Sequence, residues 1–195
     1  MQRISLVGAS GSGKSTLGRR LAEAVGGPFV ELDSIQHQAG WVQLPPEELR
    51  RRVDELTRGD RWVVDGNYSN VRESVVWPRA DTVIWLDPPR RVVMRQVTRR
   101  TLGRVLLRRE LWNGNRESLR NVLSRDPDRS ILMWAWSTHS IVHDRYKAAA
   151  GDPRWAHLDF IRLGSRREMD DFRAGLASEA TAGAAGAGTP AGSGR

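Results

Sequence analysis

Short apolar runs alternate with amphipathic stretches along most of this chain. Apolar runs rich in Val, Ile and Leu that stop at a glycine or an acid are typical of buried strands. The stretches between them have helical spacing and carry helix-start signals, such as Pro45-Pro46-Glu47-Glu48 and the capping box Ser165-Arg166-Arg167-Glu168. The pattern predicts strands at 4–7, 29–32, 62–64, 82–86 and 157–163, and helices at 14–25, 45–57, 89–108, 129–148 and 166–176.

Strands that alternate with helices predict a parallel sheet with helices on both faces. The predicted fold class is therefore α/β, a three-layer fold with five parallel strands. Ligands bind such sheets beyond the carboxyl ends of the strands. Four of the five predicted strands end at Gly8, Asp33, Asp65 and Asp87. One glycine turn and three carboxylates are thus expected along one edge of the sheet, where a functional site is expected.

A phosphate-binding loop follows the first predicted strand and opens the first predicted helix. The pattern Gly-x4-Gly-Lys-Ser/Thr is matched by Gly8, Ala9, Ser10, Gly11, Ser12, Gly13, Lys14, Ser15 and Thr16. Its glycines let backbone N–H groups turn inward, and the helix N-terminus adds partial positive charge. Lys14 is expected to reach the β- and γ-phosphates, and Ser15 to offer its hydroxyl to Mg²⁺. The loop therefore predicts ATP and Mg²⁺ as ligands.

Length and composition narrow the class of protein. The 195 residues, 39% hydrophobic and 28% charged, are enough for one α/β domain with a core. The absence of cysteine excludes disulfides, Cys-ligated zinc and thiol catalysis. No uncharged apolar run reaches the ~18 residues of a spanning helix, and the N-terminus shows no cleavable signal, so a cytoplasmic location is expected. Ala and Gly supply 12 of the last 19 residues, which predicts a flexible tail at 177–195 after a domain at 1–176.

Positive charge is concentrated in one part of the chain. Between Arg90 and Arg129 there are twelve Arg against four acidic residues, a net +8 that equals the net charge of the whole protein. Arginines spaced four apart on a helix repel one another, at a cost of about 0.2–0.5 kcal/mol per pair. A helix that carries this cost indicates an anionic partner, such as the phosphates of a nucleotide or of a nucleic acid.

Several motifs resemble those of a known superfamily. The loop at 8–16, followed by Leu17-Gly18-Arg19-Arg20-Leu21-Ala22, resembles the P-loop small-molecule kinases of the adenylate-kinase and shikimate-kinase type. More narrowly, the chain resembles the adenylate-kinase-related "DNA topology modulation", or FlaR-like, proteins over about residues 1–175. That resemblance is carried by Leu32-Asp33-Ser34-Ile35, Gly40-Trp41-Val42, Trp62-Val63-Val64-Asp65-Gly66-Asn67-Tyr68 and Leu111-Trp112-Asn113-Gly114-Asn115-Arg116-Glu117.

The resemblance implies roles for particular residues. Asp65 would hold a water of the Mg²⁺ ion beside Ser15, with Asp87 as a second candidate that alternatively caps the Arg-rich helix. Asp33 would face the acceptor as a catalytic residue. The Arg-rich helix would lead into a lid at about 99–128 that closes over the phosphates, and the expected phosphate contacts are Arg95, Arg99 and Arg100.

The acceptor itself is left open by the sequence. If it is a hydroxyl compound, Asp33 orients the hydroxyl or accepts its proton; if it is a nucleoside monophosphate, Asp33 only positions it. The stretch Asp65-Gly66-Asn67-Tyr68 lacks the Gly-Phe-Pro-Arg sequence by which adenylate kinases grip a monophosphate. An acceptor pocket is predicted from Asp33, Trp41, Asn67, Tyr68 and Arg116, with His37 nearby.

Four residues with ring side chains on the predicted helix 129–148 are assigned structural roles. Trp134 and Trp136 are predicted to lie in the core, and His139 and His143 to support the fold, because no acidic third ligand accompanies them.

The sequence thus predicts an ATP- and Mg²⁺-dependent phosphotransferase that acts on an unidentified small acceptor, without a membrane partner. The alternative is an ATP-regulated nucleic-acid-binding protein. Because the Arg block is poor in aromatic residues, only weak nucleic-acid binding is predicted, at low salt.

Overall fold

The computed structural model describes residues 1–107, 110–115, 124, 126 and 130–186. Its core is a five-stranded parallel sheet with the strand order β2-β3-β1-β4-β5. The predicted α/β three-layer fold is confirmed. The strands are β1 (Arg3–Gly8), β2 (Phe29–Glu31), β3 (Trp62–Asp65), β4 (Thr82–Leu86) and β5 (Asp159–Leu163).

Helices connect the strands and cover both faces of the sheet. The α-helices are α1 (Lys14–Val25), α2 (Leu32–Gln36), α3 (Pro46–Leu56), α4 (Ser69–Val71), α5 (Arg90–Leu106), α7 (Ile131–Ala150) and α8 (Arg166–Gly186). Single turns are η1 (Ala39–Trp41), a π-helical turn η2 (Arg72–Val76), η3 (Trp112–Gly114) and η4 (Pro153–Trp155).

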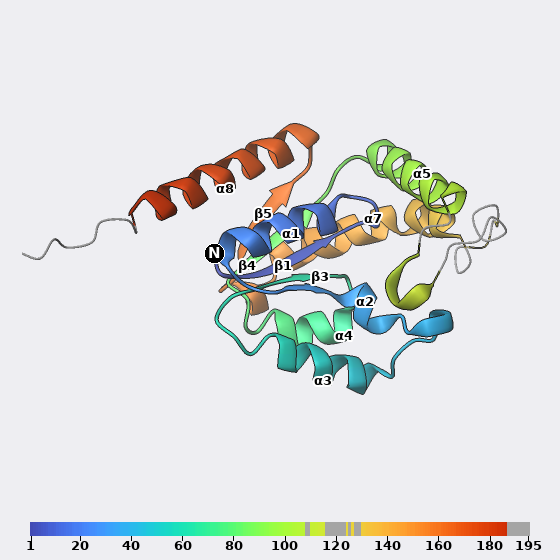
Figure 1. Ribbon diagram of the computed structural model, residues 1–195, viewed down its shortest axis with the longest axis horizontal. Coiled ribbons are helices and arrows are strands. Elements are labelled where there is room, and N and C mark those ends of the chain that lie inside the picture. The colour runs from blue at the N-terminus through green and yellow to red at the C-terminus, as the bar shows by residue number, and fades with distance from the viewer. Residues whose placement is uncertain (108–109, 116–123, 125, 127–129, 187–195) are drawn as a thin grey trace, which may run out of the picture.

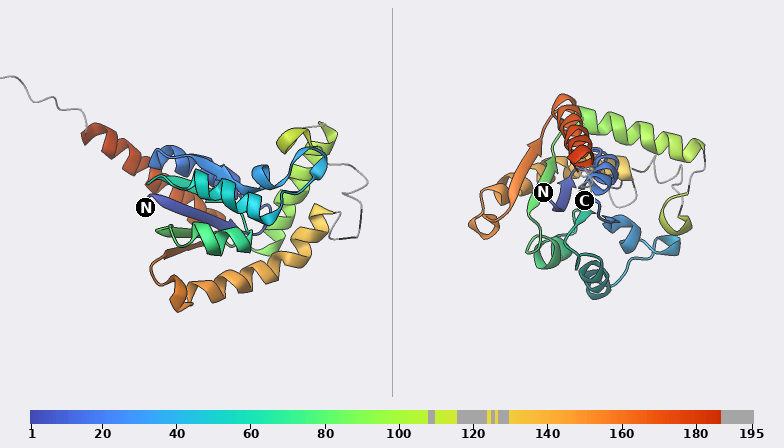
Figure 2. Two further views of the ribbon diagram at one scale, coloured as in Figure 1. Left: turned by 90° about the horizontal axis from the view of Figure 1, so that it is seen from below. Right: turned by 60° about the vertical axis from the view of Figure 1, so that its left-hand side comes forward.

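Two apolar layers hold the helices against the sheet. On one face, residues of β1, β3 and β4 pack with α1 and with the first turns of α8. On the other face the sheet packs with α3, η2 and α7, around the fully buried Trp62, Trp77 and Tyr146. Figure 1 shows α1 and α8 on one side of the strands and α3 and α4 on the other, and Figure 2 shows the same layers from two further sides. A third, smaller cluster packs α5 on α7 and on Ala9 of the phosphate loop.

The predicted boundaries differ from the structure by two residues or fewer, except at the end of the last helix. The second strand was predicted through Leu32, but β2 ends at Glu31 and α2 begins at once. Local bonds explain this early turn, because Ser34 Oγ donates to the Glu31 carbonyl (2.7 Å) and His37 N–H donates to that of Asp33 (3.0 Å). The last helix was predicted to end at 176, but α8 continues to Gly186. Alanine has the highest helix propensity, which favours this extension into the Ala-rich segment.

The core prediction for the α7 tryptophans is wrong. Trp134 and Trp136 are 46% and 52% exposed, and Trp136 lies under the guanidinium of Arg90 at 5.0 Å. The inward positions of α7 are taken by Ala135, Val142 and Tyr146, which leaves both indoles on the outside. Among the described residues, none of the helices combines the length and the apolar character needed to cross a membrane.

Candidate active site

The phosphate loop runs from the end of β1 into α1 and depends on glycine. Gly8, Gly11 and Gly13 have φ values of +136°, +82° and +103°, a region that residues with a side chain rarely adopt. A Cβ on Gly8 would lie 2.2 Å from the Leu86 carbonyl oxygen, and one on Gly11 would lie 2.1 Å from Val97 Cγ2. The loop is therefore held close to β4 and α5, and it accepts no larger residue at these positions.

The polar groups of the loop suit an anion. The Lys14 ammonium lies over the loop, where it donates to the carbonyls of Gly8 (2.9 Å) and Ala9 (3.1 Å). Ser12 Oγ is buried and has no hydrogen-bond partner among the described residues. An unsatisfied buried hydroxyl is costly, and a phosphate oxygen would satisfy it. The loop thus fits the nucleotide phosphates that its sequence predicts.

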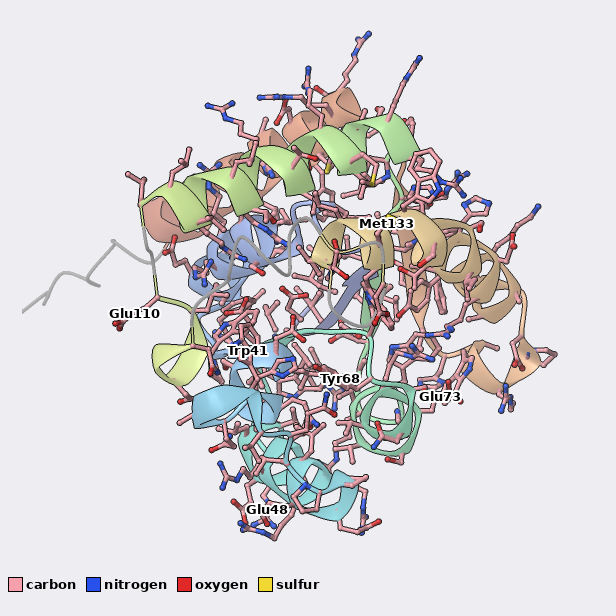
Figure 3. All side chains as sticks on the ribbon, turned by 90° about the vertical axis from the view of Figure 1, so that its right-hand side faces the viewer. Trp41, Glu48, Tyr68, Glu73, Glu110 and Met133 are labelled. Atoms are coloured by element: carbon pink, nitrogen blue, oxygen red, sulfur yellow. The ribbon has the colours of Figure 1, made fainter. Side chains whose placement is uncertain are left out.

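Three oxygen-bearing side chains converge on the start of α1. Ser15 Oγ lies 2.8 Å from Asp65 Oδ2 and 2.9 Å from Glu31 Oε1. The two acids are direct neighbours in the sheet, since Glu31 pairs with Asp65 in the β2–β3 ladder. Figure 3 looks onto this face of the molecule, with Trp41 and Tyr68 near its centre.

The environment of Asp65 fits a cation. Burial raises the pKa of the Asp65 carboxyl to about 6, and the nearby Asp33 and Glu31 also raise it, while Lys14 and the Ser15 hydroxyl lower it. Carboxylate and hydroxyl oxygens are the ligands that Mg²⁺ prefers. No cluster of three or more His, Asp or Glu side chains suited to a metal occurs in the described part of the chain. A Mg²⁺ ion held by Ser15 and Asp65 would therefore keep waters and phosphate oxygens as further ligands.

The side chain of Asn67 is attached to the phosphate loop. Its Nδ2 donates to the Gly8 carbonyl (2.8 Å), and its Oδ1 accepts from the Gly8 N–H (3.2 Å). Asn67 was predicted to line an acceptor pocket, but both ends of its amide are engaged by Gly8. The amide instead fixes the loop residue whose carbonyl also accepts from Lys14.

A buried chain of hydrogen bonds supports Asn67 from behind. The Tyr146 hydroxyl donates to Asn67 Oδ1 (2.8 Å) and accepts from Arg72 Nη1 (2.9 Å). Arg72 is only 2% exposed, and its guanidinium lies 4.7 Å from the ring centre of Trp77 and 5.2 Å from that of Tyr146. Its charge is paired with Glu73. Charge pairing and ring contacts make the burial of this cation tolerable.

On the acceptor side, Asp33 and Tyr68 meet. The Tyr68 hydroxyl donates to Asp33 Oδ1 (2.8 Å) and lies 3.5 Å from His37 Nε2. Burial raises the pKa of the Tyr68 hydroxyl, and the charge of Asp33 raises it further, so the phenol stays protonated and serves as a donor. Although Asp33 lies in the first turn of α2 and not at a strand end, it is brought next to Tyr68, as the predicted pocket requires.

The arginines predicted to contact phosphate lie on two different faces of α5, one toward the phosphate loop and one toward the outside. Arg100 Nη2 lies 3.4 Å from Ser10 Oγ of the phosphate loop. Arg95 and Arg99, also predicted as phosphate contacts, are exposed and lie along the outer face with Arg91. The reason is helical phase: Val93 and Val97 point inward, and Arg95 and Arg99 stand on the opposite side. Arg116 lies outside the described residues, as do the other positions of 116–123 and residues 108–109, 125 and 127–128 of the predicted lid at 99–128.

Asp87 forms a separate cluster that does not include Ser15. Its carboxylate accepts from His143 Nδ1 (2.9 Å) and from Arg162 Nη2 (2.7 Å), and only 6% of the side chain is exposed. His139 Nε2 contacts the Pro88 carbonyl at 3.0 Å. These contacts join β4, β5 and α7, which is consistent with structural roles for both histidines.

Sequence reasoning did not find four residues that the structure brings to the site: Glu31, Arg72, Trp112 and Tyr146. The strand was predicted to continue through Leu32, so Glu31 was placed inside the strand and not at its functional end. Trp112 donates its indole N–H to Glu31 Oε2 at 3.2 Å, across 81 positions of the chain. No local pattern marks such a partner, although Trp112 does fall in a motif that carries the family resemblance.

Known proteins share part of this sequence. No family model matches the chain. A shikimate kinase of Synechococcus sp. (strain RCC307) is 34% identical over 117 residues, which cover 53% of this chain and 60% of that protein. A putative adenylate kinase of Thermococcus gammatolerans is 32% identical over 108 residues, which cover 52% of this chain and 58% of that protein. The chain thus spans about three fifths of the length of these curated relatives.

A solved structure shares the fold. The shikimate kinase from Acinetobacter baumannii in complex with shikimate superposes with a TM-score of 0.53 over 94% of both chains, at 18% sequence identity. At this identity the similarity concerns the fold alone, but the fold agrees with the sequence relatives. The chain is thus similar to P-loop small-molecule kinases in part of its sequence and in its fold. The phosphate loop and its support by Asn67 can therefore be tested with nucleotide as the ligand.

The first prediction concerns the hydroxyl of Tyr146. We expect Tyr146→Phe to lower the free energy of unfolding by about 1–3 kcal/mol, because Arg72 and Asn67 lose a buried partner. The variant should also show a smaller rise in melting temperature with ATP–Mg²⁺, since Gly8 is held less firmly. Urea unfolding and melting curves measure both effects. The chain's other tyrosine gives the control: Tyr68→Phe should leave the ATP-induced rise unchanged, and an equal loss in both variants would contradict the proposed support.

The second prediction concerns Asp65 without nucleotide or metal. Its pKa is about 6 in the folded chain and about 4 when unfolded, so the folded state binds more protons between these pH values. The contribution of Asp65 to stability therefore falls as pH rises from 4 to 6, by about 3 kcal/mol in total, and is constant above that. We expect the difference in unfolding free energy between wild type and Asp65→Asn to follow this curve. A difference that does not change with pH would contradict the raised pKa.

Proposed function

We propose that this protein is an ATP- and Mg²⁺-dependent phosphotransferase that transfers the γ-phosphate of ATP to a hydroxyl group of a small molecule. The observation that carries the proposal is the turn after β3. Within four residues, Asp65 contacts Ser15 of the phosphate loop, Asn67 contacts Gly8, and Tyr68 contacts Asp33. One rigid turn thus connects a phosphate side and an acceptor side, which is the arrangement that direct transfer requires.

On the phosphate side, the protein supplies positive charge and fixed backbone donors. Lys14 and Arg100 border the loop and would stabilise the charge that develops on the transferred group. Mg²⁺, held by Ser15 and by Asp65 through water, would neutralise phosphate charge. These residues do no covalent chemistry, and their contribution is position and electrostatic stabilisation.

On the acceptor side, Asp33 would receive a proton. The acceptor oxygen forms a bond to the γ-phosphorus, the bond between that phosphorus and the β,γ-bridging oxygen breaks, and ADP leaves. The hydroxyl proton passes to the Asp33 carboxylate. The Tyr68 hydroxyl donates to Oδ1 of this carboxylate and so fixes its orientation, which leaves Oδ2 to receive the proton. The absence of a Gly-Phe-Pro-Arg stretch after β3 favours a hydroxyl acceptor over a nucleoside monophosphate, whose phosphate needs no base.

The relatives agree with small-molecule transfer. They are named shikimate kinase and adenylate kinase, and nothing among them favours nucleic-acid binding as the function. The narrower resemblance to "DNA topology modulation" proteins, and weak DNA binding by the Arg-rich face of α5, remain predictions.

The third prediction tests the proposal with two variants that act on different sides. Lys14→Ala should abolish the ATP–Mg²⁺-induced rise in melting temperature while the ligand-free protein stays folded, because the phosphate grip is lost. Asp33→Asn should keep that rise but lower phosphate transfer to any acceptor by at least tenfold. Transfer is followed by ³¹P NMR across a panel of alcohols, sugars and nucleosides. An unchanged rise in Lys14→Ala, or full transfer by Asp33→Asn, would overturn the assignment.

The fourth prediction uses two adjacent arginines as a matched pair. Arg100→Gln should lower kcat/KM for ATP by at least tenfold, because Arg100 contacts the phosphate loop. Arg99→Gln removes the same charge from the exposed face of α5 and should change kcat/KM by less than twofold. Steady-state kinetics of ADP release measure both. Equal losses would mean that the net charge of α5, and not the position of Arg100, matters.

A further inference from the structure

The turn η3 is fastened to the acceptor side of the site. Asn113 Nδ2 donates to two carbonyls of the segment that follows β2, those of Ser34 (3.2 Å) and His37 (2.6 Å). Asn113 itself has φ +55°, a conformation that asparagine tolerates better than most residues. The Asn113 side chain therefore joins η3 to the end of α2 through two hydrogen bonds.

A second asparagine completes this attachment. Asn115 is only 4% exposed, and both ends of its amide are used. Its Nδ2 donates to the Gln38 carbonyl (2.9 Å), and its Oδ1 accepts from the Trp41 N–H (2.9 Å). The two asparagines hold η3 and η1 against each other, so the side chains between them are fixed before any acceptor binds.

Four aromatic rings are brought together by this attachment. His37 stacks on Trp112, with ring centres 6.0 Å apart and planes at 21°. His37 and Trp41 pack edge to face, with ring centres 5.5 Å apart. The Tyr68 hydroxyl lies 3.5 Å from His37 Nε2 and donates to Asp33. The ring set therefore starts at the carboxylate that the proposed function assigns to the acceptor hydroxyl.

In the part of the chain that the structure describes, the charged groups hydrogen-bonded to this ring set are carboxylates. Asp33 accepts from Tyr68, and Glu31 accepts from the Trp112 indole. The described residues provide no Lys or Arg side chain hydrogen-bonded to Asp33 or to any of the four rings. Arg19 contacts Glu31 at 3.4 Å, the Ser15 carbonyl and the ring of Phe29, and its own side chain is 59% exposed.

We infer that the acceptor is an alcohol that also carries a protonated or quaternary amine. This inference rests on the proposed function. The hydroxyl lies at Asp33, and the cationic group lies against the rings of Trp41, His37 and Trp112, where aromatic faces and the charges of Glu31 and Asp33 attract it. An acceptor with a carboxylate or phosphate in that place would meet like charge and would find no described cation to pair with it.

The test compares acceptors that share a skeleton and differ in charge. Choline, its uncharged isostere 3,3-dimethylbutan-1-ol and 3-hydroxypropionate form one set, and 3-aminopropan-1-ol, butan-1-ol and 4-hydroxybutyrate form another. ADP release with ATP–Mg²⁺ gives kcat/KM for each compound. We expect the order cation, neutral, anion, with the cation at least tenfold above the anion. An anion that matches or exceeds its cationic partner overturns the inference, as does failure of every member while ATP–Mg²⁺ still raises the melting temperature.

A variant series tests the ring that is least buried. Trp41→Leu should raise KM for the cationic acceptor about tenfold and leave KM for ATP unchanged, and Trp41→Phe should restore most of the loss because it keeps an aromatic face. Trp134→Leu is the matched control, since Trp134 is similarly exposed, 46% against 41%, but lies on α7. An unchanged KM in Trp41→Leu overturns the role of the rings. Failure of ATP to bind at all would instead overturn the phosphotransferase assignment, and this inference with it.

Discussion

The two hydrogen bonds between the Asn67 amide and the backbone of Gly8 hold the phosphate loop and the turn after β3 in one fixed arrangement. Strands β1 and β3 are neighbours in the sheet, with Leu6 opposite Asp65, so the two segments leave the sheet side by side. Given that register, Asp65 reaches Ser15 and Tyr68 reaches Asp33 without further adjustment. The phosphate, metal and acceptor sides of the candidate site therefore share a single support.

That support depends in turn on a charge placed in the apolar layer beneath the sheet. Arg72 lies against the rings of both Trp77 and Tyr146 and donates to the Tyr146 hydroxyl, which donates to Asn67. A guanidinium suits this position because its flat face stacks on rings while its edge donates hydrogen bonds, and a lysine would do neither as well. The cost of burying the charge is offset by Glu73 and by the rings, and the result is an amide held in a single orientation.

Charge is separated across the site. The phosphate loop is bordered by Lys14 and Arg100, whereas Glu31, Asp33 and Asp65 lie on the side of α2 and β3. The cationic side suits the proposed nucleotide, and the anionic side suits the proposed metal ion and the proposed cationic acceptor. Arg91, Arg95 and Arg99 lie on the outer face of α5, which explains why a high local charge in the sequence does not produce an equally crowded phosphate site.

The sequence by itself determined the features that arise from neighbouring residues. The alternation of apolar runs and helical stretches was enough to predict the five parallel strands and the long helices, and the glycines of the phosphate loop marked the site through their local backbone conformations. Only the tertiary structure decided which side chains meet. Asn67 forms a hydrogen bond with Gly8, which is 59 positions away in the sequence, and Trp112 forms one with Glu31, which is 81 positions away. It also decided that α2 begins right after Glu31 and that Arg95 and Arg99 face outward. Local periodicity reflects the preferences of a chain segment, but a hydrogen bond between distant side chains depends on strand register and helix phase, which are set only when the layers pack.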